Sequence, residues 1–200
     1  MNIITAPVEP VSLALARLQC KLDAEGDPPS HPDDPLLKIY IGDAREYAET
    51  MLGHRVAKVV VETALPAFPS GDIELESGPL FGVDSVKYLD QDGVQQTLDA
   101  GTYAVDDNPT PALLRLAPSH SWPATSISPS AVVIRYTLGY SAVNDDDQTK
   151  PLPNSIVAAM LLVIAHRYRN REDTTVETMQ SVPLGASAQL YPIKTRLGFA

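Results

Sequence analysis

The side chains that could do chemistry in this 200-residue sequence are few and lie far apart. The histidines are His31, His54, His120 and His166, and none has a second histidine or a cysteine at the spacing of a metal-ligand pair. We therefore interpret them as structural residues. The single cysteine, Cys20, excludes an internal disulfide and a cysteine-based zinc site within this sequence.

The acidic side chains also lack the spacing that catalysis or calcium binding requires. The run Asp145-Asp146-Asp147 has neither the glycine turn nor the closing glutamate of a calcium loop, so we interpret it as a solvated loop. Glu46 and Glu49 are not spaced as a facing pair of catalytic acids, and we expect both to solvate the outer face of a helix. No nucleophile elbow, phosphate-binding loop or dinucleotide fingerprint occurs. The sequence predicts no catalytic residue, no metal and no cofactor.

Three arginines near the end of a predicted helix, Arg167, Arg169 and Arg171, allow two interpretations. In the first they stabilise the negative end of the helix dipole and pair with Glu172 and Asp173. In the second they contact a neighbouring subunit or passing DNA. We favour the first for any single arginine and keep the second open.

Composition narrows the range of partners. A formal charge of -10 argues against a surface built to grip DNA, although DNA can slide past such a surface. The most apolar run, residues 156–165, is shorter than the roughly 20 residues that cross a bilayer. The first residues lack a signal-peptide pattern. We expect a soluble, intracellular protein that does not contact a membrane.

The elements that must position these residues are organised around one helix, predicted over residues 153–171. Its apolar side chains recur at helical spacing and extend to a second side, which is available to a neighbouring subunit. Asn154 or Ser155 is expected to cap its first turn. Two earlier helices are predicted over residues 13–23 and 33–53, the first capped by Ser12 and the second stopped by Gly53.

A β-rich block lies between the second and third helices. The predicted strands cover residues 56–65, 73–75, 83–89, 94–98, 103–105, 113–116 and 131–138. The pair Asp92-Gly93 predicts a hairpin turn between two of them. Loops rich in proline and serine separate most of the others, notably residues 117–130.

The predicted fold class is therefore α+β: a small helical bundle of three main helices, a β-rich insertion between the second and third, and an extended C-terminal tail. The predicted division is residues 1–55 with 150–172 for the helical part, 56–149 for the insertion and 173–200 for the tail. The tail shows spaced apolar residues without periodicity, and so long a structureless segment is unusual in a compact domain. We expect it to become ordered on a partner surface.

The order of these segments resembles the head–tail connector (adaptor, or head-completion) proteins of long-tailed bacteriophages. The matching stretches are residues 7–14, Ala44 to Glu49 with Gly53-His54-Arg55, Val86 to Asp90 with Asp92-Gly93, Tyr103 to Asp106, Ser121-Trp122-Pro123, Val133 to Tyr140, and Pro153 to His166 with Tyr168 and Asn170 to Glu172. Each stretch is short, but they occur in the family's order over nearly the whole chain. Leu190-Tyr191-Pro192 resembles the aromatic and proline of the family's tail.

The resemblance implies a structural protein of the virion neck and not an enzyme. Its implied partners are the portal protein, adjacent copies in a dodecameric ring, and a downstream connector, stopper or tail protein, while packaged DNA passes through without sequence-specific recognition. The helical part would build the ring, the insertion would project from it, and the tail would grip the portal. The residues expected at the portal are Leu190, Tyr191, Pro192, Leu197 and Phe199. Assembly would take place in the cytoplasm of the bacterial host.

Two alternatives stay open. The first is another neck or tail protein, a stopper or a tail terminator, which we would expect to be mainly β. The second is a small enzyme whose composite site joins distant histidines to carboxylates.

Overall fold

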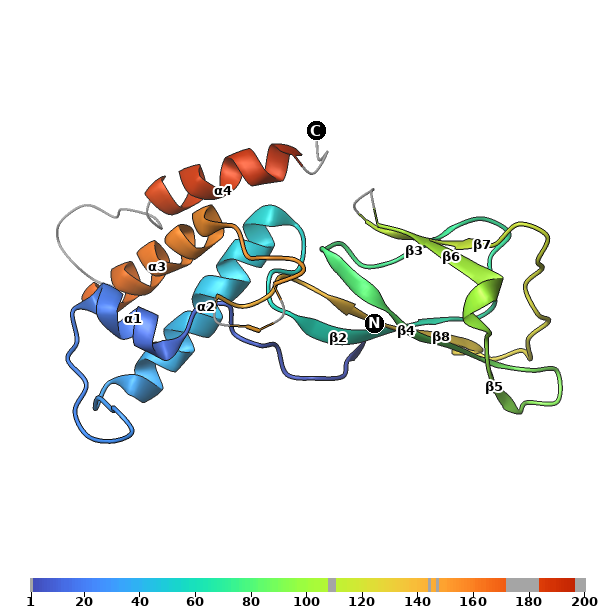
Figure 1. The fold of residues 1–200 in the computed structure, drawn as a ribbon, viewed down its shortest axis with the longest axis horizontal. Coiled ribbons are helices and arrows are strands. Elements are labelled where there is room, and N and C mark those ends of the chain that lie inside the picture. The colour runs from blue at the N-terminus through green and yellow to red at the C-terminus, as the bar shows by residue number, and fades with distance from the viewer. Residues whose placement is uncertain (1, 108–110, 144, 147, 172–183, 197–200) are drawn as a thin grey trace. The chain divides into compact units, whose positions relative to one another are not determined.

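The computed structural model describes residues 2–107, 111–143, 145–146, 148–171 and 184–196 (Figure 1). The chain divides into two compact units. The β unit comprises Met1–Val8 and Lys58–Gly139, and the helical unit comprises Glu9–Ala57 and Tyr140–Ala200. The N-terminal segment groups with the β unit because Asn2 and Ile3 pair with its second strand and Val8 bridges Lys58.

The helical unit contains four helices in its described part, where the sequence predicted three. They are α1 (Leu13–Cys20), α2 (Asp34–Leu52), α3 (Asn154–Arg169) and α4 (Leu184–Arg196). The predicted central helix, α3, packs against the other three, and Figure 1 shows α4 lying along it. The core of this unit is built from one apolar face of each helix, including Ala16, Leu37, Met160 and Leu190.

The helix ends follow the local chemistry in two of three cases. The Ser12 hydroxyl accepts a hydrogen bond from the Leu15 amide at 3.2 Å, as predicted for the cap of α1. Gly53 ends α2 with a φ of 73°, in the left-handed region that glycine adopts without strain. The predicted cap of α3 was wrong. The extended residue before this helix is Pro153, so Asn154 already lies inside the first turn.

The prediction of an extended C-terminal tail was wrong for residues 184–196, which form α4. The sequence hides this helix because Gly185 and Pro192, both poor helix formers, interrupt its periodicity. Burial holds it in place: Ala186 and Leu190 are 0% and 1% exposed and belong to the helical core. Tertiary packing here outweighs weak intrinsic propensity.

The β unit contains two antiparallel sheets. The five-stranded sheet has the order β1-β2-β8-β4-β5, and the three-stranded sheet has the order β3-β7-β6. The strands are β1 (Asn2–Ile3), β2 (Val59–Leu65), β3 (Ile73–Glu74), β4 (Leu80–Leu89), β5 (Gln95–Thr97), β6 (Tyr103–Asp106), β7 (Leu113–Leu116) and β8 (Val132–Leu138), with a short 3₁₀ turn η1 (Ala100–Thr102) before β6. All of these strands except β1 were predicted, and their ends differ by a few residues.

Strand β8 contributes four buried side chains to the core of the β unit: Val132, Ile134, Tyr136 and Leu138. Its side chains alternate strictly between buried and half-buried, as the sequence pattern predicts for a strand with one apolar face. The buried residues of both sheets form one cluster. Within it the Tyr136 hydroxyl lies 2.8 Å from the Thr63 hydroxyl and accepts a hydrogen bond from the Glu76 amide at 3.0 Å, so this buried polar group is satisfied.

Candidate functional site

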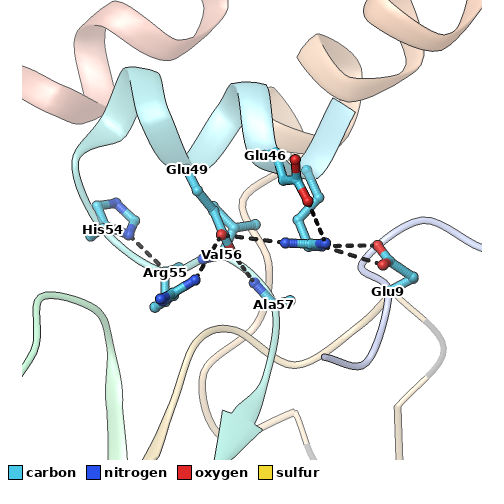
Figure 2. Close-up of polar contacts among 8 residues, drawn as sticks. Glu9, Glu46, Glu49, His54, Arg55, Val56 and Ala57 are labelled. Atoms are coloured by element: carbon cyan, nitrogen blue, oxygen red, sulfur yellow. Dashed lines mark hydrogen bonds and ion pairs between the residues drawn. The ribbon is translucent and has the colours of Figure 1, made fainter. Parts of the chain in front are cut away.

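Glu49, near the end of α2, contacts four polar groups of the helical unit (Figure 2). One carboxylate oxygen accepts hydrogen bonds from the backbone amides of Val56 and Ala57 at 3.0 and 3.2 Å. The other oxygen pairs with the guanidinium groups of Arg45 and Arg55, each at 3.4 Å. We call these five residues the Glu49 cluster.

The Glu49 cluster lies over the segment that leaves α2. The amide donors belong to Val56 and Ala57, which are 0% and 1% exposed. Without a partner each buried N–H would cost about 1–3 kcal/mol. Glu49 therefore fixes the path of the chain after Gly53. Its expected role as a solvated residue was wrong, because 12% of its side chain is exposed, against 73% for Glu46.

Arg45 joins this cluster to the segment that enters the helical unit. Its guanidinium lies 3.3 Å from the Glu9 carboxylate and 3.4 Å from that of Glu46. Glu9 and Glu49 both pair with this arginine, at 3.3 and 3.4 Å. Each described charge in the group thus has an opposite charge beside it. Such an arrangement supports structure and presents no nucleophile paired with a base.

His54 follows α2 and is the most buried of the histidines, at 5% exposure. Its Nδ1 lies 2.9 Å from the Arg55 carbonyl, and because a carbonyl only accepts, Nδ1 carries the proton. Nε2 has no hydrogen-bond partner. The ring packs edge-on against Tyr140 at a centroid distance of 5.9 Å. Burial lowers the pKa of His54, so its ring is a neutral packing group.

Two of the other histidines make local contacts. Nδ1 of His120 lies 3.0 Å from the Pro118 carbonyl in the β unit, and Nδ1 of His166 lies 3.2 Å from the Asn170 amide on α3. Among the residues that the structure describes, no group of three or more histidine, cysteine or carboxylate side chains is placed to hold a metal ion. Cys20 is half-buried on α1, and burial raises the pKa of its thiol.

Two acidic residues at the start of α2 connect this helix to its neighbours. Asp34 forms a two-armed ion pair with Arg17 on α1, with N–O distances of 2.7 and 2.5 Å. This hydrogen bonding lowers the pKa of Asp34 to about 2. Asp33 accepts hydrogen bonds from the Tyr168 hydroxyl at 2.6 Å and from Arg171 at 2.8 Å. Both bonds lower the pKa of Asp33, and the bond from Tyr168 has the larger effect. Both pairs hold helices together.

The three arginines of the α3 end fall into two kinds. Arg167 pairs with Asp43 of α2 at 2.9 Å, and Arg171 pairs with Asp33 while its guanidinium lies 4.5 Å from the Tyr168 ring centre. Arg169 is exposed. The expected partners Glu172 and Asp173 lie outside the described residues. Two of the three arginines therefore have carboxylate partners across the helical bundle.

The expected portal-binding residues that the structure describes differ in their exposure to solvent. Leu190 is 1% exposed and packs in the helical core, whereas Tyr191 is 65% exposed and Pro192 is exposed beside it. Leu197 and Phe199 lie outside the described residues. On α4, then, the structure presents Tyr191 and Pro192 to solvent and turns Leu190 inward.

No known family model matches the chain, and no curated protein sequence matches it. Solved structures do. A chain in the neck of an empty gene transfer agent (GTA) particle, computed with C6 symmetry, superposes with a TM-score of 0.71 and 22% identity, over 96% of this chain and 93% of that one. The chain has the fold of a GTA neck chain. A chain in the virion of a native GTA particle gives a TM-score of 0.70 and 21% identity, over 96% and 93%.

A chain in the neck of a native GTA particle, computed with C12 symmetry, gives a TM-score of 0.69 and 21% identity, over 96% of this chain and 92% of that one. These matches span nearly all of each chain, so they include both the helical unit and the β unit. The likeness to chains of the GTA neck therefore holds for the fold of the whole chain. None of the described helices is both long and apolar enough to cross a membrane.

Proposed function

We propose that this chain is a structural protein of a virion neck, a head–tail connector of the adaptor type. It forms a ring beneath the portal protein, extends the DNA channel and carries the next connector or the tail. The observation that supports this is the likeness in fold to GTA neck chains, which spans 96% of the chain with a TM-score of 0.71. In this proposal the chain is not an enzyme and needs no cofactor.

We further propose that the ring is a dodecamer. The similar necks were computed with C12 and with C6 symmetry. Because sixfold symmetry is contained in twelvefold symmetry, a twelve-membered ring is compatible with both. Adjacent copies would meet through two different surfaces, and such a head-to-tail interface closes when the rotation between copies divides the circle evenly.

Portal contact is proposed for the outer face of α4 and the residues that follow it. Tyr191 and Pro192 are exposed there, and aromatic side chains often dominate interfaces. Leu197 and Phe199 stay in this proposal as further contacts. Leu190 acts differently, because a side chain that is 1% exposed in its own core supports the helix that carries Tyr191.

The charge of the chain suits a channel through which DNA slides. A formal charge of -10 repels the phosphate backbone weakly and offers it few cations. Arg167 and Arg171 are paired with carboxylates, which leaves Arg169 as the better candidate for a subunit or channel contact. The proposed partners are therefore proteins, with DNA passing through without recognition of its sequence.

Of the alternatives, the stopper or tail terminator was expected to be mainly β, and the four helices argue against it. An enzyme would need a site that joins histidines to carboxylates. His54 is buried with a lowered pKa, which does not favour it for such a site.

The deciding experiment is the mass of the purified chain by light scattering, first alone and then mixed with the portal protein of the same particle. We expect a complex with one copy of this chain per portal subunit. A chain that stays a monomer and does not bind the portal would refute the proposal. A Tyr191→Ala variant that folds but no longer joins the portal would locate the contact on α4.

A further inference from the structure

The end of the β unit that carries the β4–β5 hairpin is built from two segments. The hairpin turn covers residues 90–94, and a loop of residues 124–130 lies beside it. The Ser126 amide donates to the Leu89 carbonyl at 3.0 Å, and the Leu89 amide donates to the Ala131 carbonyl at 2.8 Å. These bonds hold the loop against the end of β4. We call the two segments together the β-unit tip; Figure 1 labels the two strands of the hairpin, β4 and β5.

The β-unit tip presents apolar side chains to water. Ile127 has 107% of its reference accessible area, so it makes almost no contact within its own chain, and Val94 across the tip is 56% exposed. Single exposed apolar residues are common on protein surfaces. Ile127 differs because the segment around it is ordered: the Ala131 amide donates to the Ser128 carbonyl at 3.3 Å, closing a turn directly after it.

The base of the loop is anchored by aromatic packing. Trp122 stacks on Phe68 with a centroid distance of 4.7 Å and an angle of 2° between the ring planes. Phe68 in turn packs edge-on against Tyr88 of β4 at 5.9 Å. Because Tyr88 is adjacent to Leu89, the strand that binds the loop by hydrogen bonds also supports it by packing. Ile127 therefore projects into solvent from a loop that hydrogen bonds and aromatic packing hold in place.

The hairpin turn is braced by its own carboxylate. Asp90 accepts hydrogen bonds from the amides of Asp92 and Val94 at 3.1 and 2.9 Å, and from the Gln96 side chain at 2.8 Å. These bonds lower the pKa of Asp90 and keep its carboxylate charged, and the bond from Gln96 has the largest effect. A rigid surface loses little conformational entropy when a partner binds it.

The tip segments themselves, residues 90–94 and 124–130, carry Asp90 and Asp92 and no lysine or arginine, and Lys87 precedes them on β4. Between Lys87 and Arg115 the sequence carries acidic residues and no lysine or arginine, and between Arg115 and Arg135 it carries no lysine, arginine, aspartate or glutamate. Asp92 is exposed in the turn itself. The tip therefore combines an apolar projection with an acidic border, and its natural complement is an apolar pocket bordered by basic side chains.

We propose that the β-unit tip docks into such a pocket on the structural protein that follows this chain in the neck, with Ile127 as the buried anchor and Asp92 facing a lysine or arginine of the partner. The inference rests on the proposed function. DNA is a poor occupant, because the acidic border repels phosphates. A second copy of this chain is disfavoured as well, since its formal charge of -10 does not complement an acidic surface.

The test compares particles made with the wild-type gene and with Ile127→Asp. Heads that contain the chain are quantified by mass spectrometry, and tailed particles are counted by electron microscopy. We expect Ile127→Asp to enter heads at the wild-type level and to lower the tailed fraction at least tenfold. Asp92→Lys should lower that fraction as well, since it places two basic groups against each other. The purified variants should unfold at the wild-type urea concentration.

The matched control is Ile3→Asp, an apolar-to-acidic change at a residue that is 48% exposed on β1, at the opposite edge of the same sheet. It should leave the tailed fraction unchanged. Tailed particles at the wild-type frequency with Ile127→Asp would overturn the inference, and so would heads that lack the Ile127→Asp chain but retain Ile3→Asp. If the wild-type chain is absent from particles, the proposed function itself has failed.

Discussion

Glu49, which the sequence predicts to be a solvated residue, is a mostly buried structural residue in the fold. Its two oxygens satisfy two buried backbone amides and two guanidinium groups. The sequence gives no sign of this, because Val56 and Ala57 lie seven and eight residues beyond the glutamate. Only the turn at Gly53 brings them together. A carboxylate committed to four partners is unavailable as a general base.

Removal of this carboxylate should destabilise the helical unit. Glu49→Ala leaves the buried amides of Val56 and Ala57 without an acceptor, and we expect a loss of about 2–4 kcal/mol of unfolding free energy. Glu49→Gln keeps one acceptor and should lose less. Urea denaturation followed by circular dichroism measures both.

The control for this pair is Glu46→Ala on the same helix. The Glu46 side chain is 73% exposed and lies 3.4 Å from the Arg45 guanidinium. Exposed ion pairs contribute about 0–1 kcal/mol, so this variant should unfold close to the wild type. Equal losses for Glu46→Ala and Glu49→Ala would show that the Glu49 cluster does not fix the chain after α2.

At the scale of the element, α4 is the main failure of prediction. Helices α1, α2 and α3 each carry a regular apolar stripe, and their predicted ranges differ from the observed ones by three residues or fewer. In α4 the stripe is reduced to Ala186, Leu190 and the half-buried Ile193, and Pro192 interrupts it. A segment that is helical because its neighbours bury it has too little local signal to be predicted.

Strand prediction succeeded for a similar physical reason. Strand β8 alternates fully, and the hairpin between β4 and β5 is specified by Asp90 and by Gly93 with a φ of 77°. Strand β1 was missed because its two residues are exposed and show no alternation. It is a strand only because β2 offers a free edge. The exposed tip residue Ile127 likewise stands out only once the fold shows which side chains are covered.

The split between Leu190 and Tyr191 makes α4 testable. Leu190→Ala opens a cavity in the helical core and should cost about 2–5 kcal/mol of stability. Tyr191→Ala lies on the exposed face and should change stability by less than about 1 kcal/mol. If α4 contacts the portal, Tyr191→Ala should weaken portal binding at least tenfold in a light-scattering titration. Unchanged binding by Tyr191→Ala would remove α4 from the proposed contact.

At the scale of the whole molecule, the chain is an inserted domain in a helical one. Apart from Met1–Val8, the β unit is entered after Ala57 and left before Tyr140. These two residues form a β-bridge inside the helical unit, and the Tyr140 amide donates to the Val56 carbonyl at 2.9 Å. The ends of the insertion are therefore adjacent, which is the geometry that lets an insertion be removed without stretching its host. Each unit has its own buried apolar cluster.

This geometry predicts that the helical unit folds without the insertion. We expect a chain of residues 9–57 and 140–200, joined by a short glycine-serine linker, to keep its helical circular dichroism and to unfold in one cooperative step, because closing a short loop costs little entropy. It should still join the portal, since Tyr191 and the α4 core are intact, and it should fail to recruit the downstream neck protein, since the β-unit tip is gone. A shortened chain that is unfolded would show that the helical core depends on the β unit. One that folds and still recruits the downstream protein would place that contact on the helices.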